Sequence, residues 1–221
     1  MSGLGVVLFA GGRGVRLRSV TGDGPKALAP LHDTTLLDYQ LRRIQPLRPD
    51  RVVVLAGHQA GPIVEAVGSR AHVEIEDSLL GTAGGLYRLP QGPERWLSLN
   101  VDHVSDVDLV AFEAAARDPC TACIWEAAVP VDEGVVELDG DRLVGWQERP
   151  VLRIPVTTGL YVFSAAALRR HLSGEPIDMP DLVRRLMHEG VSTWRHTGTW
   201  FDAGTPARLA QASSWLAQRR A

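Results

Sequence analysis

The residues best suited to chemistry lie near the N-terminus, where an apolar run opens into a glycine-rich loop followed by cations. The run Val6–Ala10 is typical of a buried strand, and residues 11–14 read Gly-Gly-Arg-Gly. Glycines let backbone N–H groups approach phosphate oxygens closely, and Arg16 and Lys26 supply positive charge beyond them. The loop therefore predicts a site for nucleotide phosphates, with contacts from Ala10, Gly11, Gly12, Arg13 and Gly14.

Two other phosphate loops fit this segment less well. A P-loop places lysine directly after its last glycine, followed by Ser or Thr, and the chain has no such run. The dinucleotide fingerprint Gly-x-Gly-x-x-Gly fails at Leu17, which stands where a third glycine lets the helix pack closely on the strand. A plain glycine-rich turn with solvated arginines is the remaining alternative.

Two aspartates follow later strand-like segments. Asp102 comes directly after the run Trp96–Val101, and Asp202 lies between another such segment and the last predicted helix. A carboxylate at the tip of a buried strand loses solvation, and a bound cation compensates that loss. Because Mg²⁺ prefers oxygen ligands and leaves positions open for phosphate oxygens, the pair predicts a magnesium site. The competing interpretation is that each aspartate caps a turn or a helix.

Six motifs resemble those of the sugar-1-phosphate nucleotidylyltransferases and occur in that family's order. They are residues 11–17 (Gly-Gly-Arg-Gly-Val-Arg-Leu) with 25–28 (Pro-Lys-Ala-Leu), 80–84 (Leu-Gly-Thr-Ala-Gly), 100–102 (Asn-Val-Asp), 147–150 (Gln-Glu-Arg-Pro), 157–163 (Thr-Thr-Gly-Leu-Tyr-Val-Phe) and 200–206 (Trp-Phe-Asp-Ala-Gly-Thr-Pro). The chain departs from the family pattern where Val101 replaces Gly, Arg149 replaces Lys and Thr157 replaces Asn. The change at Thr157 points to an uncommon sugar.

The resemblance implies a reaction in which a sugar 1-phosphate oxygen attacks the α-phosphorus of a nucleoside triphosphate and pyrophosphate leaves, with Mg²⁺ as cofactor. The chain looks most like the single-domain heptose-1-phosphate guanylyltransferases, so GTP and a heptose or hexose 1-phosphate are the expected substrates. Short uridylyltransferases acting on N-acetylmuramate and hexose phosphates come next. The implied roles are Asp102 and Asp202 for the metal, Arg16 for the β- and γ-phosphates, Lys26 for the α-phosphate, Gly81, Thr82 and Ala83 for the nucleotide, Glu148, Thr158 and Gly159 for the sugar, and Arg149 for its phosphate.

Strand-like and helix-like segments alternate along the chain, which predicts a largely parallel sheet covered on both faces. Together with the resemblance, this indicates a glycosyltransferase-A-like, Rossmann-like α/β sandwich of three layers with a mixed, mainly parallel sheet, forming one domain over residues 1–221. Expected strands are Val6–Ala10, Val52–Ala56, His72–Ile75, Trp96–Val101, Thr157–Phe163 and Val191–Arg195, with a hairpin of Val135–Leu138 and Leu143–Trp146. Expected helices are Thr35–Ile44, Pro62–Val67, Ala83–Leu89, Asp106–Ala116 with a Ser105-x-x-Asp108 capping box, Pro180–His188, and one starting at Pro206 with Thr205 as N-cap.

Composition narrows the class of partner. The chain has 221 residues, 45% of them hydrophobic, and a formal net charge of −3. It has no basic stripe and no apolar run near the ~18 residues of a membrane span, so we expect neither nucleic acid nor a membrane as partner. Strand-like sequence begins almost at once, so we expect no signal peptide and a cytoplasmic location. Cys120 and Cys123 lie on a strand-like segment without further metal ligands, which predicts two free thiols.

Two functions of other classes stay open. Residues 106–108 (Asp-Val-Asp) imitate the Asp-x-Asp metal motif of glycosyltransferases, which consume a nucleotide sugar and release no pyrophosphate. The same aspartates also fit a helix start, where acidic residues favour the helix dipole. The second alternative is a non-catalytic module that senses a nucleotide with the same fold.

Four further residues near these motifs have structural or ligand-binding interpretations. His103 follows Asp102, and adjacent strand residues face opposite ways, so we expect it to be solvated or hydrogen-bonded rather than a metal ligand. His58 either borders the base or begins a helix, and Trp200 either lines the sugar site or packs beneath Asp202. Trp146 is expected in the core.

Overall fold

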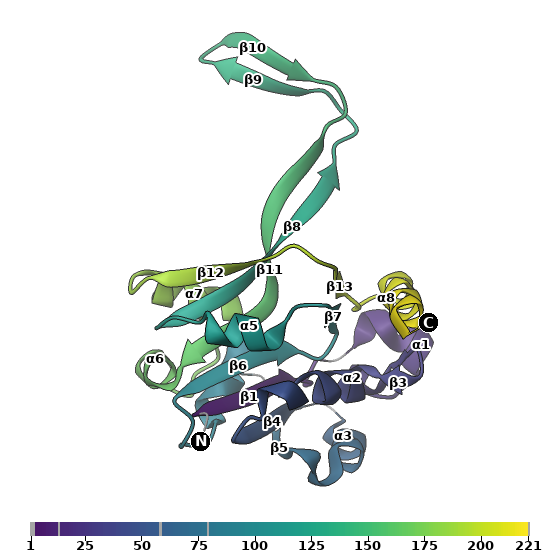
Figure 1. The fold of residues 1–221 in the computed structure, drawn as a ribbon, viewed down its shortest axis with the longest axis vertical. Coiled ribbons are helices and arrows are strands. Elements are labelled where there is room, and N and C mark those ends of the chain that lie inside the picture. The colour runs from purple at the N-terminus through teal and green to yellow at the C-terminus, as the bar shows by residue number, and fades with distance from the viewer. Residues whose placement is uncertain (1–2, 13, 58, 79, 221) are drawn as a thin grey trace.

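A computed structural model describes residues 3–220 except 13, 58 and 79. Its centre is a seven-stranded sheet with the strand order β12-β8-β11-β6-β1-β4-β5 (Figure 1). β11 runs antiparallel to both of its neighbours, whereas the other neighbouring strands are parallel. The strands are β1 (Leu4–Phe9), β4 (Arg51–Ala56), β5 (His72–Ile75), β6 (Arg95–Asn100), β8 (Cys120–Pro130), β11 (Val151–Ser164) and β12 (Val191–His196).

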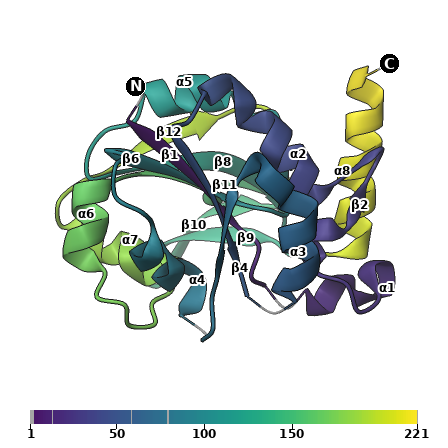
Figure 2. The same ribbon diagram turned by 90° about the horizontal axis from the view of Figure 1, so that it is seen from below.

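Helices cover both faces of this sheet, as Figure 2 shows. Two separate apolar clusters pack beneath them, one against α2, α3, α5 and α8 and the other against α4, α6 and α7. The predicted three-layer sandwich with a mixed, mainly parallel sheet is therefore confirmed. The helices are α1 (Arg18–Thr21), α2 (Leu36–Arg43), α3 (Ala60–Val67), α4 (Gly81–Gly84), α5 (Leu109–Ala114), α6 (Ala165–His171), α7 (Met179–Met187) and α8 (Pro206–Arg220).

Short strand pairs complete the fold. They are β2 (Pro30–Leu31) with β3 (Thr34–Thr35), β7 (His103–Ser105) with β13 (Trp200–Asp202), and the hairpin β9 (Val135–Asp139) with β10 (Arg142–Gln147). The hairpin was predicted, but its position was not. β8 and β11 continue as a two-stranded ladder beyond the rest of the sheet and carry β9–β10 at their end, away from the helices (Figure 1). We call residues 126–153 the arm.

One of the two predicted helix caps is present and the other is not. Thr205 Oγ1 accepts a hydrogen bond from Arg208 N at the start of α8, as expected. The predicted capping box is wrong, because Ser105 lies in β7 and Asp108 itself accepts from the first amides of α5 at 2.9–3.0 Å. The predicted Ala83–Leu89 helix is split into α4 and a 3-10 turn at Gly85–Arg88.

The two thiols are free and buried on opposite faces of the sheet, because Cys120 packs in one apolar cluster and Cys123 in the other. Burial raises the pKa of the Cys120 thiol to about 12, so it is inert at neutral pH. Among the described helices, none is long and apolar enough to cross a membrane.

Candidate functional site

The turn after β6 places Asp102 at the carboxyl end of the parallel part of the sheet. Asp102 is only 7% exposed. Gln40, a fully buried residue of α2, fixes this turn by donating from Nε2 to the carbonyl oxygens of Val101 at 3.3 Å and His103 at 2.5 Å. A glutamine on the apolar side of a predicted helix was the sequence signal for this role, and our sequence analysis did not use it.

A second acid reaches the same place through strand pairing. β13 runs antiparallel to β7 with Asp202 opposite His103, and Ala203 N donates to the carbonyl oxygen of Asp102 at 2.8 Å. Gly204 follows, and a Cβ at this position would lie 2.8 Å from Asp202 Oδ1, 3.3 Å from Asp102 Oδ2 and 3.1 Å from Arg16 Nη2. Gly204 therefore borders both acids and Arg16, the arginine predicted to bind the β- and γ-phosphates.

Lys26 completes the group. Its ammonium forms an ion pair with Asp102 Oδ2, and both side chains are mostly buried. Gly14, in a left-handed conformation at φ 60°, packs on the Lys26 side chain, because a Cβ there would lie 2.9 Å from Lys26 Cβ. The structure thus brings together Arg16, Lys26, Asp102 and Asp202, which are up to 186 positions apart in sequence.

The charges in this group depend on one another. Burial alone would raise the pKa of Asp102, but the charge of the Lys26 ammonium and its hydrogen bond outweigh that effect and hold the pKa of the carboxyl below its ordinary value. Burial lowers the pKa of the His103 imidazole, even with Asp102 and Asp202 nearby. The ring is therefore neutral at pH 7 and retains a lone pair.

The residues present fit a divalent cation. Asp102, His103 and Asp202 each offer one ligand atom, and these atoms lie within 4.8 Å of one another. His103 Nδ1 is buried without a hydrogen-bond partner among the described residues, whereas Nε2 lies 3.3 Å from Asn100 Nδ2. Two carboxylates suit Mg²⁺, and an added imidazole also suits Mn²⁺.

The expectation that His103 faces away from Asp102 is wrong. β6 ends at Asn100 and β7 begins at His103, so Asp102 lies in a turn and strand alternation does not apply across it. The expected hydrogen-bonded histidine is present, but it lies beside the acids. Trp200 stands edge-on to its ring at 5.3 Å, and the Trp200 Nε1 donor is also buried without a partner in the described part of the chain.

The other end of the glycine-rich loop lies beside Glu76, which directly follows β5. A Cβ on Gly11 would lie 3.1 Å from Glu76 Oε2, and a Cβ on Gly85 would collide with the same carboxyl group. Burial raises the pKa of Glu76 above its ordinary value. Between residues 76 and 85, the sequence prediction used only the glycine motif at 80–84. The signal it missed is an acid at the carboxyl end of a parallel strand.

The predicted nucleotide-binding segment 81–83 has most of its donors engaged within the chain. Thr82 N and Oγ1 donate to Asp178 Oδ1 at 2.9 and 3.1 Å, and Ala83 N donates to Ile177 O at 3.0 Å. Gly81 has φ 77°, and a Cβ there would lie 2.5 Å from Ile177 O, so only glycine fits. These contacts hold α4 and Gly85 against the Glu76 side of the loop.

This geometry agrees with the comparisons to known proteins. Residues 6–174 match the MobA-like NTP transferase domain. The chain belongs to this family. The match confirms the nucleotidyltransferase relationship that the sequence motifs indicated.

Relatives within the curated proteins are sugar-phosphate nucleotidyltransferases by name. The chain is 25% identical to the low-salt glycan biosynthesis nucleotidyltransferase Agl11 of Haloferax volcanii, over 94% of this chain and 64% of the relative. It is 27% identical to a putative mannose-1-phosphate guanyltransferase of Sulfolobus acidocaldarius, over 90% and 59%. It is 26% identical to the N-acetylmuramate alpha-1-phosphate uridylyltransferase of Neisseria meningitidis, over 94% and 96%. The chain thus spans less than two thirds of the first two relatives.

Solved structures share the fold. A putative glucose-1-phosphate thymidylyltransferase from Bacillus anthracis superposes with a TM-score of 0.77 at 18% identity, covering 96% of this chain and 94% of that one. HddC from Yersinia pseudotuberculosis superposes with a TM-score of 0.70 at 19% identity, covering 96% and 99%. HddC has also been solved with GMP-PN bound.

The residues of this chain that were predicted to bind the sugar lie in two separate regions of the structure. Gly159 lies against the side chains that flank Asp102, because a Cβ there would be 2.7 Å from Asn100 Nδ2 and 2.8 Å from His103 Nδ1. Thr158 is fully buried and its hydroxyl donates to Cys123 O at 3.0 Å, so its side chain is committed to the sheet. Both lie where the β11–β8 register shifts, a bulge of the kind often found beside active sites.

Glu148 and Arg149 are not brought to the acids. They lie on the arm between β10 and β11, and both side chains are largely exposed. Arg149 adopts a left-handed backbone at φ 44°, which is uncommon for a residue with a side chain. Two other predicted positions, Arg13 and His58, lie outside the described residues.

Trp146 corrects another expectation, because it is 61% exposed on the arm rather than in the core. Its Nε1 donates to Glu148 Oε2 at 3.0 Å. Within the Asp-x-Asp motif, Asp108 fits the helix-start interpretation, whereas Asp106 lies before the helix and is engaged elsewhere. Asp106 accepts from Thr199 N at 2.7 Å and pairs with His196 and Arg219, while Asp108 caps α5.

Proposed function

We propose that the chain is a sugar-1-phosphate nucleotidylyltransferase, with one nucleotidyltransferase domain over residues 1–221. The observation that carries the proposal is the meeting of Lys26, Asp102 and Asp202 at one end of a glycine-rich loop, with Arg16 in contact with Gly204. The names of the relatives support this reaction class. The glycosyltransferase alternative is not favoured, because the carboxylates it needs are engaged in capping and ion pairs.

The residues fit a transfer in which two anionic groups must approach. The sugar phosphate and the triphosphate repel each other, so catalysis depends on positioning and on neutralising charge. Asp102 and Asp202, with His103, would hold a divalent cation that neutralises phosphate oxygens and polarises the α-phosphate. Lys26 would stand beside the α-phosphate, and Arg16 would stabilise the pyrophosphate as it leaves. This direct transfer requires no nucleophilic side chain.

GTP is the nucleotide that the site supports best. Guanine presents two adjacent donors, N1–H and the exocyclic amino group, and a carboxylate can accept from both. Uracil and thymine present a single N–H between two carbonyl acceptors, which a carboxylate repels. Glu76 lies against Gly11, where a base would extend from the phosphate loop. The acceptor would be a heptose or hexose 1-phosphate.

The experiment combines the protein with Mg²⁺ or Mn²⁺, each common nucleoside triphosphate and a panel of sugar 1-phosphates, and measures pyrophosphate. We expect release that requires both substrates and is fastest with GTP. A glycosyltransferase would release nucleoside diphosphate from a nucleotide sugar instead, and a sensing module would bind nucleotide without turnover. Either result would contradict the proposal.

Glu76 gives a sharper test of the base. We expect Glu76→Gln to lower kcat/KM for GTP by about 10–100-fold, the effect of leaving buried donors of the base poorly paired, and to affect UTP much less. The matched control is Glu74→Gln, since Glu74 lies on β5 two residues before Glu76 and pairs with Arg88. An equal loss for all nucleotides would remove Glu76 from base recognition.

The pH dependence should carry the same signature. Because burial raises the pKa of Glu76, its carboxylate gains a proton at a higher pH than an ordinary glutamate does. The protonated group no longer accepts two hydrogen bonds, so the preference for GTP over UTP should fall with pH. This pH dependence should be absent in Glu76→Gln, and its persistence there would assign it to another group.

A further inference from the structure

The arm carries an apolar face that its own chain does not cover. In β9 and β10 the cross-strand pairs Val136↔Trp146 and Leu138↔Leu143 lie on one face, whereas Glu137, Asp139 and Arg142 lie on the other. Leu138 is 64% exposed and Leu143 is 54% exposed. An isolated two-stranded hairpin is marginally stable in water, so an apolar face of this kind marks a contact surface.

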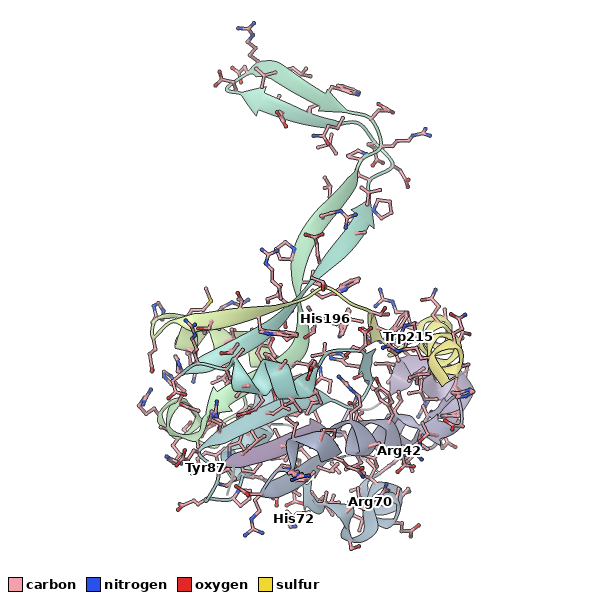
Figure 3. The ribbon with its side chains drawn as sticks, viewed as in Figure 1. Arg42, Arg70, His72, Tyr87, His196 and Trp215 are labelled. Atoms are coloured by element: carbon pink, nitrogen blue, oxygen red, sulfur yellow. The ribbon has the colours of Figure 1, made fainter. Side chains whose placement is uncertain are left out.

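The arm also holds substrate residues at a distance from the centre. β11 pairs with β8 from Val156↔Trp125 to Val151↔Pro130, which at about 3.3 Å per residue is about 16 Å of extended ladder. Trp125 marks the edge of the site, since its ring lies 5.6 Å from Trp200. Glu148 and Arg149 lie at the far end of this ladder, beyond the reach of their side chains to Asp102. Figure 3 shows the arm's side chains standing clear of the helices.

Charge identifies the partner surface. Between Glu126 and Arg153 the arm has seven carboxylates and three arginines, a net charge of −4. The whole chain carries −3, so the remainder carries +1. Exposed cations border the site on the body, among them Arg16, and Arg208 beside Asp202. The acidic arm is therefore complementary in charge to these cations at the site of a second copy of the same chain.

We infer that the arm acts in trans: two copies associate about a two-fold axis, and each arm brings Glu148 and Arg149 to the sugar-phosphate side of the other copy's centre. Two-fold symmetry makes the exchange reciprocal, so both apolar faces are covered and both sites are completed. The left-handed backbone at Arg149 fits a residue held for a ligand. The inference rests on the proposed function for the role of these two residues, but the association itself does not.

The test uses two variants that should each show little activity alone when the sugar 1-phosphate is kept well below its KM for the arm variant. One chain carries Asp102→Asn with an intact arm, and the other carries Glu148→Ala and Arg149→Ala with an intact centre. The two are co-expressed with different tags and purified through both. If the arm acts in trans, each mixed dimer has one complete site and should show about half of the wild-type pyrophosphate release. No recovery in a mixed dimer would show that each arm serves its own chain, and would overturn the inference.

Failure of the proposed function gives a different result, because the wild-type protein would then release no pyrophosphate. The association is in that case decided by sedimentation velocity on the wild type, Leu143→Ser and the control Val64→Ser, an exposed apolar side chain on the body. We expect a dimer that Leu143→Ser converts to monomer and Val64→Ser does not. A wild-type monomer, or a dimer unaffected by Leu143→Ser, would overturn the inference. Circular dichroism verifies that each variant is folded.

Discussion

The body and the arm hold their expected substrate residues in opposite ways. In the body, Asp102 is buried, paired with Lys26 and fixed by hydrogen bonds from Gln40 to its turn. On the arm, Glu148 and Arg149 are exposed and contact chiefly their own neighbours. The body thus preorganises its charges with its own packing, whereas the arm provides reach. The difference fits the proposals above, in which one chain holds the phosphate-binding charges and the arm takes part in sugar recognition on another surface.

Among the side chains expected to contact phosphate rather than the metal, removing the amine of Lys26 should have the largest effect on activity. Lys26→Ala is expected to lower kcat/KM by about 10²–10⁴-fold, the range for losing one preorganised charge at the reacting phosphate. Steady-state pyrophosphate release measures it. Arg184→Ala, an exposed cation of α7 paired with Asp181, is the matched control and should keep wild-type turnover. Near-wild-type turnover in Lys26→Ala would remove this residue from the catalytic group.

Truncating an apolar side chain should lower the free energy of unfolding much more in the body than on the arm. Leu97 is fully buried in β6, and Leu97→Ala should lower the free energy of unfolding by about 2–5 kcal/mol. Leu143→Ala on the arm should cost about 0.5 kcal/mol or less when the protein is dilute enough to be monomeric. Urea denaturation at low concentration measures both. Equal losses at the two positions would mean that the arm packs on its own body.

Sugar recognition should depend on the arm in a way that nucleotide binding does not. Arg149→Ala is expected to raise KM for the sugar 1-phosphate by about 10–100-fold, as one charge-assisted contact is lost, with KM for GTP changed little. Arg142→Ala, on the opposite side of the hairpin from the apolar face, is the control. A comparable change in both KM values would show that Arg149 acts on the whole site rather than on the sugar phosphate.

The sequence predicted which charged side chains would come together better than it predicted the structure around them. Motif types and spacing singled out Lys26, Asp102 and Asp202, and the structure brings these three side chains together. His103 was misplaced because strand alternation is a local rule and the strand ends before Asp102. Trp146 was misplaced because alternation shows which residues share a face, but not whether that face is covered. Nothing in the local pattern indicated that the ladder would extend beyond the sheet.

The most direct measurement of the central claim follows the label of α-³²P GTP in the presence of a sugar 1-phosphate and a divalent cation. The account predicts that wild-type protein moves the label into a nucleotide sugar, with unlabelled pyrophosphate released in equal amount and no label left on the protein. Asp102→Asn should move none. Label transfer by Asp102→Asn at the wild-type rate, or label bound covalently to the wild-type chain, would contradict direct transfer at this group of residues.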